Sequence, residues 1–465
     1  MKKISFGNKA GYMFGDLANG LTFGMSAGFL LAFYTDALGI TAVAAGTLFL
    51  VARIWDAIND PMMGAITDKI FQKRAKKYHG TKKGKKVDKF RPFLLMGSWP
   101  VVLAAILMFF APEGFSMGQK LIWAYATYIL WGMTYTFVNI PYGSLAAVMT
   151  QDPVERSSLA VARGLGGMFG NILPRVLVPL FLVQFADKQA TGYLLAMVVM
   201  GIAAVISYIF SYRMTEENVK QDINAAEAGE IKFKDSFKVL IKNRPFIAVC
   251  IASIAMLLGL MINGAMSVYY FRENLDALGL MALTGVTMIV PMLIIAPLMS
   301  KIVKKFGTKK TVAWSSLISA SVYSIAFIMP DNVYIYLGLT LIAGIFMGIP
   351  NMLIWGMVSD CIDYNQYLCG HRQEGVIYGS YSFVRKLGQA LAGFIAGLGL
   401  SIVGYVANAA QQSSSVLMGI KFLTIGMPAI GMFVAWMSFQ FIWNLTTEKQ
   451  KEVVLHINAE PDTAI

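Results

Sequence analysis

The chain has 465 residues, of which 57% are hydrophobic and 14% charged, and its mean hydropathy is +0.60. So apolar a composition excludes a water-soluble globular protein and indicates a polytopic protein whose main solvent is lipid. The formal net charge is +13, but the basic residues concentrate between apolar segments, so nucleic-acid binding is not expected.

Apolar segments of membrane-spanning length recur along the whole chain. A helix crosses the hydrocarbon core with roughly 20 apolar residues at about 1.5 Å each. The first segment is full length and lacks a small-residue cleavage pattern, so we expect it to remain as a span and not to act as a signal peptide. The pattern predicts twelve spans, at residues 10–37, 42–68, 92–111, 120–149, 158–184, 191–212, 245–271, 281–300, 311–329, 333–360, 375–405 and 418–444.

The basic residues between these spans predict the orientation. If both termini are cytoplasmic, 30 of the 39 Lys and Arg lie in inner segments and six lie within spans. The outer loops then hold three, Lys120, Lys188 and Arg272. Because cytoplasmic loops retain Lys and Arg, we expect a multi-pass protein of the cytoplasmic membrane with both termini inside.

The second predicted span, residues 42–68, carries charged side chains near its middle. In "VARIWDAINDPMMG", Asp56 and Asp60 share a helical face, Asn59 is adjacent, and Arg53 lies three positions before Asp56. Carboxylates at this depth are costly unless they have partners in the bundle interior. One base cannot balance two acids, so the second acid should take up a proton or attract a cation. A coupling-ion site and a purely structural ion-pair network both remain open.

The chain divides near its middle. Residues 213–244 are polar and mixed in charge, with six predicted spans on either side, and a basic turn follows the second span of each half. We therefore expect an all-α membrane protein with twelve transmembrane helices in two six-helix bundles. The bundles are residues 1–212 and residues 245–465 with a cytoplasmic tail, joined by a cytoplasmic linker. This is the major facilitator architecture, whose substrate sites lie near the membrane midplane.

Three motifs carry a resemblance to a known family. The stretches "GTLFLVARIWDAINDPMMG", "YILWGMTYTFVNIPYGSL" and "DCIDY…VRKLGQA" resemble the glycoside-pentoside-hexuronide:cation symporter family, whose best-known member is the melibiose carrier. The resemblance runs from about residue 10 to residue 405. It implies a major facilitator that moves glycosides together with H+, Na+ or Li+.

The resemblance also implies roles for individual residues. Asp56 and Asp60 match the two helix-2 carboxylates of the family's cation site, and Asn59 and Thr136 match polar neighbours that help to hold Na+ or Li+. Arg53 matches part of the surrounding charge network. The positions that match the sugar site or lie near it are Asp16, Tyr135, Arg163 and Lys386.

Two positions depart from the melibiose carrier. Asn139 stands where that carrier has a second sugar-binding aspartate, and Gly143 where it has a tryptophan. An amide both donates and accepts hydrogen bonds, whereas a carboxylate only accepts, and the missing indole removes an apolar face. We therefore expect Asn139 to bind a different sugar, first a β-xyloside or other pentoside and then a β-glucuronide.

Each assigned residue has a structural alternative. Asn139 could satisfy the backbone break made by a nearby proline, and Arg163 could snorkel at the inner end of its span. Tyr135 could belong to an ordinary aromatic helix surface. Asp16 and Lys386 could pair with other buried charges and never touch substrate.

The function that follows is symport of a glycoside with Na+ or H+ by alternating access, in a membrane lipid environment. The three His and three Cys show no metal-ligand spacing, so we expect no enzyme, no catalytic residue, no cofactor and no metal beyond the coupling ion. One chain supplies both halves of a pathway, which suits a monomer. Two rivals remain: a major facilitator carrying an amphipathic lipid such as a lysolipid, and an intramembrane enzyme whose acids hold Mg²⁺ on a diphosphate.

Overall fold

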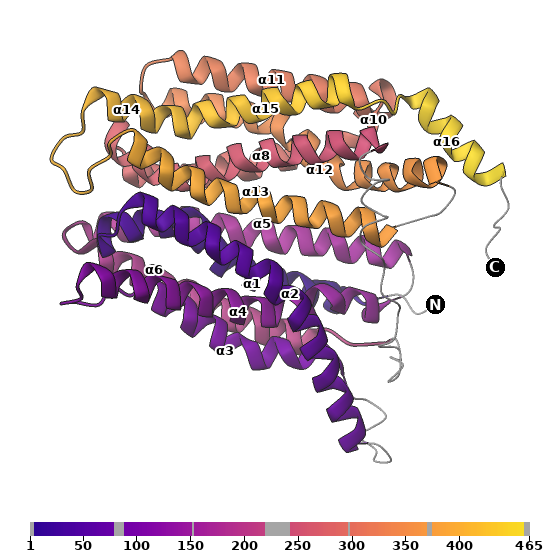
Figure 1. Cartoon of the computed structure of the whole chain (residues 1–465), viewed down its shortest axis with the longest axis horizontal. Helices are drawn as coiled ribbons and strands as arrows, with labels where there is room; N and C mark the ends of the chain where they lie inside the picture. Colours follow the sequence, from indigo (N-terminus) through magenta and orange to yellow (C-terminus); the bar gives the residue numbers. More distant parts are fainter. Residues whose placement is uncertain are drawn as a thin grey trace. The chain divides into compact units, whose positions relative to one another are not determined.

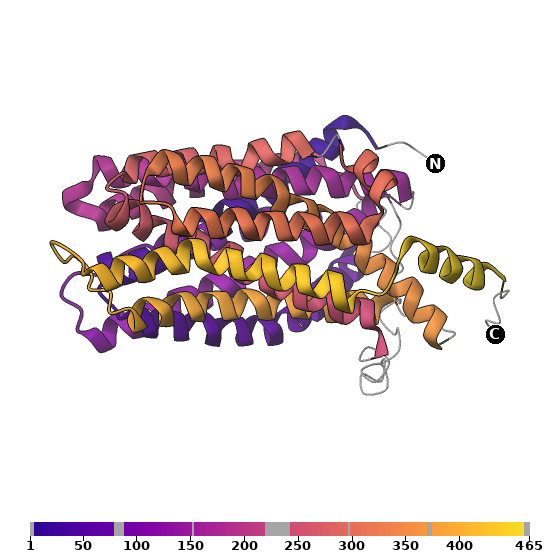
Figure 2. The same ribbon diagram turned by 90° about the horizontal axis from the view of Figure 1, so that it is seen from above.

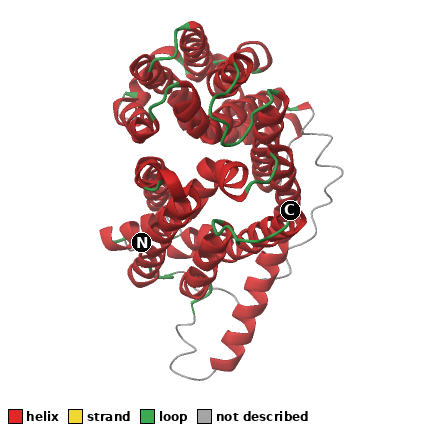
Figure 3. Ribbon diagram, turned by 90° about the vertical axis from the view of Figure 1, so that its left-hand side faces the viewer, coloured by secondary structure: helices red, strands yellow, loops and turns green. Residues whose placement is uncertain are grey.

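The computed structural model describes residues 4–78, 88–150, 153–218, 242–295, 298–369 and 374–459. Every regular element in these ranges is a helix, as Figure 3 shows. The chain forms two compact units, residues 1–229 (unit 1) and 230–465 (unit 2). Their boundary lies outside the described residues, so the linker expected at 213–244 stays a prediction.

Unit 1 is built from long helices that lie alongside one another (Figure 1). One of them, α2, continues well past residue 68, where the predicted span ends, because the basic and unbranched residues that follow also favour helix. The elements are α1 (Phe6–Ala32), η1 (Phe33–Leu38), α2 (Ala42–Tyr78), α3 (Arg91–Met108), α4 (Met117–Met149), α5 (Pro153–Gln184), η3 (Ala186–Lys188) and α6 (Gln189–Met214).

Unit 2 is also built from helices that lie alongside one another (Figure 2). Several of them are followed or interrupted by short π-helical or 3-10 turns. The elements are α8 (Arg244–Tyr269), η4 (Tyr270–Asn274), η5 (Leu278–Leu283), α9 (Thr284–Ile295), α10 (Met299–Phe306), α11 (Thr308–Ile328), α12 (Val333–Cys369), α13 (Glu374–Ile402), α14 (Ser414–Lys421), η6 (Phe422–Gly426), α15 (Met427–Met437), η7 (Ser438–Ile442) and α16 (Thr447–Ala459).

The two units repeat one packing pattern. In unit 1, α1 packs against α5 and α6, α3 packs against α4 and α6, and α2 packs against α4. In unit 2, α8 packs against α13 and α15, α11 packs against α12 and α15, and α9 packs against α12. The counterparts are therefore α1 and α8, α2 and α9, α3 and α11, α4 and α12, α5 and α13, and α6 and α15. Such internal repeats are common in secondary transporters.

Eight helical stretches of the described residues are long and apolar enough to cross a membrane. They cover eight of the predicted spans, so the all-α membrane class holds. The predicted spans at 42–68, 120–149 and 375–405 coincide with α2, α4 and α13, which contain many charged, aromatic or hydroxyl side chains. The span predicted at 281–300 coincides with α9 and α10. The count of twelve spans stays a prediction.

The close approach of α1 and α5 depends on glycine. A Cβ added to Gly166 would lie 2.1 Å from the Met13 carbonyl oxygen, and one added to Gly170 would lie 2.6 Å from the Leu17 carbonyl oxygen. Both distances are shorter than side chains tolerate, so only glycine lets the two backbones meet. Small residues serve this purpose in membrane helix packing generally.

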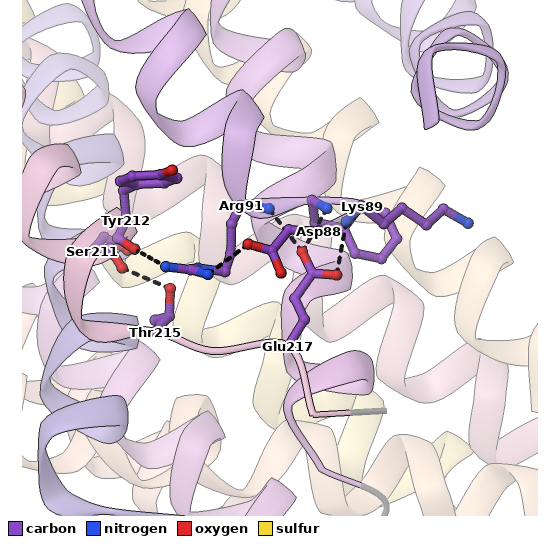
Figure 4. A network of polar contacts seen from close by, with 8 residues as sticks. Asp88, Lys89, Arg91, Ser211, Tyr212, Thr215 and Glu217 are labelled. Carbon is purple, nitrogen blue, oxygen red and sulfur yellow. Dashed lines mark hydrogen bonds and ion pairs between the residues drawn. The ribbon is translucent and has the colours of Figure 1, made fainter. Parts of the chain in front are cut away.

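A polar network fastens the segment after α6 to the start of α3 (Figure 4). The Glu217 carboxylate accepts hydrogen bonds from the backbone N–H groups of Lys89 (2.8 Å), Phe90 (2.7 Å) and Arg91 (2.9 Å). These are donors that a helix N-terminus leaves unsatisfied. Burial raises the pKa of Glu217 above its ordinary value, although the three N–H groups act in the opposite direction.

Arg91 completes this network. Its guanidinium pairs with Asp88 at 2.6 Å, donates to the Tyr212 carbonyl oxygen at 2.6 Å, and lies 5.0 Å from the centre of the Tyr212 ring. These contacts join the start of α3 to the end of α6.

Candidate functional site

The charged stretch of α2 forms an ion pair within the helix. Arg53 Nη1 lies 3.1 Å from Asp56 Oδ2, and both side chains are largely buried. The Arg53 guanidinium also lies 5.6 Å from the centre of the Phe23 ring of α1. The pair indicated by the sequence spacing is therefore present. The Arg53–Asp56 pair carries no net charge, so any further ionised acid nearby adds negative charge.

Helices α2 and α4 meet at the level of Asp56. The Phe49 ring on α2 lies 5.4 Å from the Tyr128 ring on α4. Further along both helices, a Cβ added to Gly132 would lie 3.0 Å from Asp56 Oδ1. The second contact lies closer to the C-terminal end of both helices than the first, so α2 and α4 run in the same direction.

The other residues expected to bind a cation follow within one turn. Thr136 lies one turn after Gly132 on α4, and Asn59 and Asp60 lie one turn after Asp56 on α2. Asn59 and Thr136 are buried, and within the described part of the chain the Asn59 amide nitrogen has no hydrogen-bond partner. Thr136 does have an interaction partner. The side chain of Asp60 lies outside the described residues, so its role stays a prediction.

A second ion pair joins α1 to α5. Arg163 Nε lies 3.5 Å from Asp16 Oδ1, and the Arg163 side chain is 43% exposed. Its guanidinium lies 5.4 Å from the centre of the Tyr142 ring on α4. Tyr142 stacks on Tyr12 at 4.7 Å and donates a hydrogen bond to the Tyr12 carbonyl oxygen at 2.7 Å. Arg163 is thus held by an acid and an aromatic ring, which a freely snorkelling side chain would not need.

The space around this pair is set by two glycines. A Cβ added to Gly167 would lie 2.5 Å from Asp16 Oδ2, so the Asp16 carboxylate occupies room that only glycine leaves. A Cβ added to Gly143 would lie 3.8 Å from Arg163 Nη1. The position that carries tryptophan in the melibiose carrier therefore borders the guanidinium, and its glycine leaves that side of Arg163 open.

Asn139 lies on the same helix one turn before Gly143 and is half-buried. Among the described residues, its amide makes no hydrogen bond to the backbone that Pro141 interrupts. The backbone-satisfying alternative for Asn139 therefore gains no support from the structure.

Aromatic rings connect the two ion pairs of unit 1, since Tyr135 also interacts electrostatically with Asp16 and Arg163. The Phe23 ring, which faces Arg53, lies 6.2 Å from the Tyr135 ring. The Tyr135 ring in turn lies 5.3 Å from the Trp131 ring on the same helix. Tyr135 is thus the sugar-site candidate that contacts a ring bordering the α2 ion pair.

Lys386 lies on α13 in unit 2, is half-buried and has an interaction partner. The other four candidates for the sugar site, Asp16, Tyr135, Asn139 and Arg163, belong to unit 1.

Several residues around these sites were not indicated by the sequence. Tyr12, Phe23, Trp131 and Tyr142 look like ordinary aromatic residues in apolar helices. Phe23 lies beside Arg53 and Tyr142 beside Arg163, while Tyr12 stacks on Tyr142 and Trp131 lies next to Tyr135. These positions depend on helix packing, and local spacing carries no signal of it.

The fold repeats one helix packing in two units, and ion pairs lie within its long helices. These features are typical of a polytopic membrane carrier. The family described as MFS/sugar transport protein matches residues 11–446. The chain belongs to this family, and the resemblance to glycoside-pentoside-hexuronide:cation symporters is confirmed.

Three relatives from bacteria are similar over nearly the whole chain. "Uncharacterized symporter YjmB" of Bacillus subtilis (strain 168) is 38% identical, covering 97% of this chain and 95% of its own. "Glucuronide carrier protein homolog" of Escherichia coli (strain K12) is 33% identical, covering 98% and 96%. "Putative glycoside/cation symporter YagG" of the same organism is 29% identical, covering 93% and 92%.

Among solved structures, the nucleoside transporter NupG is similar with a TM-score of 0.64 at 10% identity, over 94% of this chain and 99% of that one. This supports the major facilitator fold. The protein is an integral membrane transporter of the symporter type, consistent with the expectation that it is not an enzyme. The lysolipid-carrier and Mg²⁺-enzyme alternatives gain no support from these comparisons.

Proposed function

We propose that this protein imports a glycoside in symport with a monovalent cation by alternating access. The observation that carries the proposal is the connection between two ion pairs of unit 1: Arg53 pairs with Asp56 and faces Phe23, which contacts Tyr135 near the Asp16–Arg163 pair. An ion bound at one pair can therefore affect the shape of the other.

The cation site consists of Asp56, Asn59, Asp60 and Thr136, with Arg53 as a fixed counter-charge. Arg53 and Asp56 cancel, so the Asp60 carboxylate supplies the net negative charge that attracts Na+, Li+ or H+. Amide and hydroxyl oxygens are suitable additional ligands for a small hard cation. A buried Asn59 and a buried Thr136 fit this role.

The sugar site in unit 1 consists of Asp16, Tyr135, Asn139 and Arg163, and the role of Lys386 in unit 2 stays a prediction. Asp16 accepts hydrogen bonds from sugar hydroxyls, Arg163 donates, and Asn139 does both. Tyr135 offers a ring face. Bound substrate competes with Asp16 for Arg163, so the ion pair would open in the loaded state.

The substrate is a β-glucuronide, with a β-xyloside or other pentoside as the second candidate. The glucuronide ranks first because a relative that is 33% identical over 98% of the chain is named a glucuronide carrier homolog. Asn139 in place of an aspartate also lowers the negative charge that an anionic sugar would meet.

In the transport cycle the cation binds first, reduces the negative charge beside Asp56 and orders the helices that shape the sugar site. Sugar then binds and the carrier opens inward. The membrane is the cytoplasmic one, with both termini inside and a single chain as the working unit. Because coupling is reciprocal, cation and sugar raise each other's affinity by the same factor, commonly about 5- to 150-fold.

Calorimetry of the purified protein tests the proposal. β-glucuronides, β-xylosides and α-galactosides are titrated at several concentrations of Na+ and Li+ and at several pH values. We expect one class of glycoside to bind more tightly when the cation is present, and the effect to disappear in Asp56→Ala and Asp60→Ala. Asp187→Ala, at an exposed acid of η3, is the matched control and should keep the effect. Absence of any cation effect at every pH would overturn the proposal.

A further inference from the structure

Arg385 is a further arginine deep within a helix, and none of the roles above uses it. It lies eleven positions after the first residue of α13, about 16 Å along the helix. Its guanidinium lies 5.4 Å from the centre of the Trp355 ring on α12 and 6.0 Å from that of Tyr381. Its Nη1 donates a long hydrogen bond of 3.5 Å to the Tyr381 hydroxyl.

Arg385 has no acidic partner. In the part of the chain that the structure describes, it forms no ion pair, although it is half-buried. Arginine stays protonated in proteins, so the charge cannot be removed by a shift in pKa. Contact with aromatic rings stabilises such a cation only partly.

Unit 1 shows the same arrangement with an acid added. Arg163 lies ten positions after the first residue of α5, the counterpart of α13. Its guanidinium lies 5.4 Å from the ring of Tyr142 on α4, the counterpart of α12. There the charge is balanced by Asp16 of α1.

Helix α8, the counterpart of α1, contains no acidic residue. It supplies the neutral hydroxyl of Ser253, which lies 2.9 Å from the hydroxyl of Tyr381, the residue that Arg385 contacts. Unit 2 therefore repeats the arginine and the aromatic ring of unit 1 but omits the acid.

Charged side chains at such a depth are expected to line a water-filled cavity and to find a partner of opposite charge. Since the described residues supply no such partner to Arg385, we infer that the partner is the anionic group of the transported sugar. The inference rests on the proposed function and makes it more specific: Arg385 binds a hexuronide carboxylate. Trp355, which is 42% exposed, presents an apolar ring next to the guanidinium for the sugar ring.

Three glycosides with one common aglycone isolate this interaction. The p-nitrophenyl β-D-glucuronide, β-D-glucoside and β-D-xyloside share the ring hydroxyls and differ in carrying a carboxylate, a hydroxymethyl group or hydrogen at C5. Their binding in the presence of the coupling cation is measured by calorimetry for the unmodified protein, Arg385→Gln and Arg385→Lys. Arg272→Gln is the matched control, because Arg272 already pairs with Glu273 at 2.8 Å.

We expect Arg385→Gln to weaken glucuronide binding about 10- to 100-fold, as loss of a charge-assisted hydrogen bond does. Binding of the glucoside and the xyloside should change less than about threefold. Arg385→Lys should retain part of the glucuronide affinity, because it keeps the charge but loses the paired N–H geometry. Arg272→Gln should bind all three like the unmodified protein.

Three results would overturn the inference while leaving symport intact: equal losses for all three glycosides, no loss for any, or an unmodified protein that binds the xyloside with a cation but not the glucuronide. Failure of every glycoside to respond to a cation would instead overturn the proposed function. A melting curve for each variant separates loss of binding from loss of folding. If Arg385→Gln does not fold, Arg385→Lys, which keeps a positively charged side chain, still tests the inference.

Discussion

Arg163 in unit 1 and Arg385 in unit 2 occupy corresponding places and differ in their counter-charge. Both guanidiniums lie 5.4 Å from the centre of an aromatic ring on the neighbouring helix. Arg163 is balanced by Asp16, whereas Arg385 has no acidic partner among the described residues. One repeat is internally neutral at this point and the other carries a free positive charge, which is the kind of asymmetry that an anionic substrate would complete.

The same contrast extends to the contact between α2 and α4. There Gly132 borders the Asp56 carboxylate, whereas in unit 2 a Cβ added to Gly344 of α12 would meet Pro291 of α9 at 3.3 Å. Unit 2 repeats the contact between the two helices, but α9 contains no acid to match Asp56. A duplicated fold can thus carry an acid in one repeat and omit it in the other while keeping the helix geometry of both.

The largest effect is expected from Asp16→Asn, which makes Arg163 resemble Arg385. Xyloside affinity should fall about 100-fold, because the sugar loses an acceptor and a buried charge loses its partner. Glucuronide affinity should fall less, because the freed Arg163 attracts a carboxylate. Calorimetry with both sugars measures the difference, and Asp187→Asn at an exposed site serves as the control. A loss for the glucuronide as large as that for the xyloside would break the comparison.

A smaller effect is expected from rebuilding the acid in unit 2. Gly166 lies against Met13, three residues before Asp16, and Gly388 lies against Ile254. By this register Leu257 is the counterpart of Asp16.

Leu257→Asp should therefore place a carboxylate near Arg385 and weaken glucuronide binding about tenfold, as a competing ion pair does. Leu257→Asn has nearly the same size without the charge, so it separates the electrostatic effect from disturbed packing. Calorimetry should show the asparagine variant binding glucuronide more tightly than the aspartate variant. Equal binding by both would mean that the two positions do not correspond.

Much of this arrangement can be predicted from the sequence where contacts are local. Arg53 and Asp56 are three positions apart on one helix, so their pair follows from helical periodicity, and the apolar segments predict the helices. The Asp16–Arg163 contact joins residues far apart in the chain and depends on the glycines that let α1 and α5 meet. Likewise, Arg385 reads as one more charge in "VRKLGQA" until α12 places Trp355 beside it.

A still smaller effect is expected at the contact between α2 and α4. In Gly132→Ala the new Cβ would lie 3.0 Å from Asp56 Oδ1, so the carboxylate must shift by a few tenths of an ångström. The cation's enhancement of glycoside binding should weaken about three- to fivefold, as a modest distortion of a fixed ligand geometry does. Gly344→Ala, at the corresponding contact of unit 2, should leave the enhancement unchanged. A loss in both variants would indicate a general packing effect and not a role of Asp56.

The smallest effect is expected at the start of α3, which Glu217 caps. In unit 2 a different hydrogen bond joins two helices near the end of the unit: Gln450 of α16 donates to Asp360 of α12 at 2.7 Å. Glu217→Gln replaces the oxygen that accepts from Lys89 by an N–H₂ donor. Stability should therefore fall by about 1 kcal/mol, as for loss of a helix cap. Thermal melting in detergent should show a decrease of a few degrees, while glycoside affinity stays unchanged.

The difference in melting temperature between the unmodified protein and Glu217→Gln should depend on pH. Burial raises the pKa of Glu217 in the folded protein, so the folded state takes up a proton more readily than the unfolded state. Its contribution to stability is therefore fully present below the unfolded-state pKa and is lost as pH rises through the folded-state pKa. Relative to Glu217→Gln, which cannot titrate, the unmodified protein should gain melting temperature as pH falls from 7 toward about 4.5. A relative loss over that range would mean that the backbone N–H groups outweigh burial and hold the carboxylate ionised.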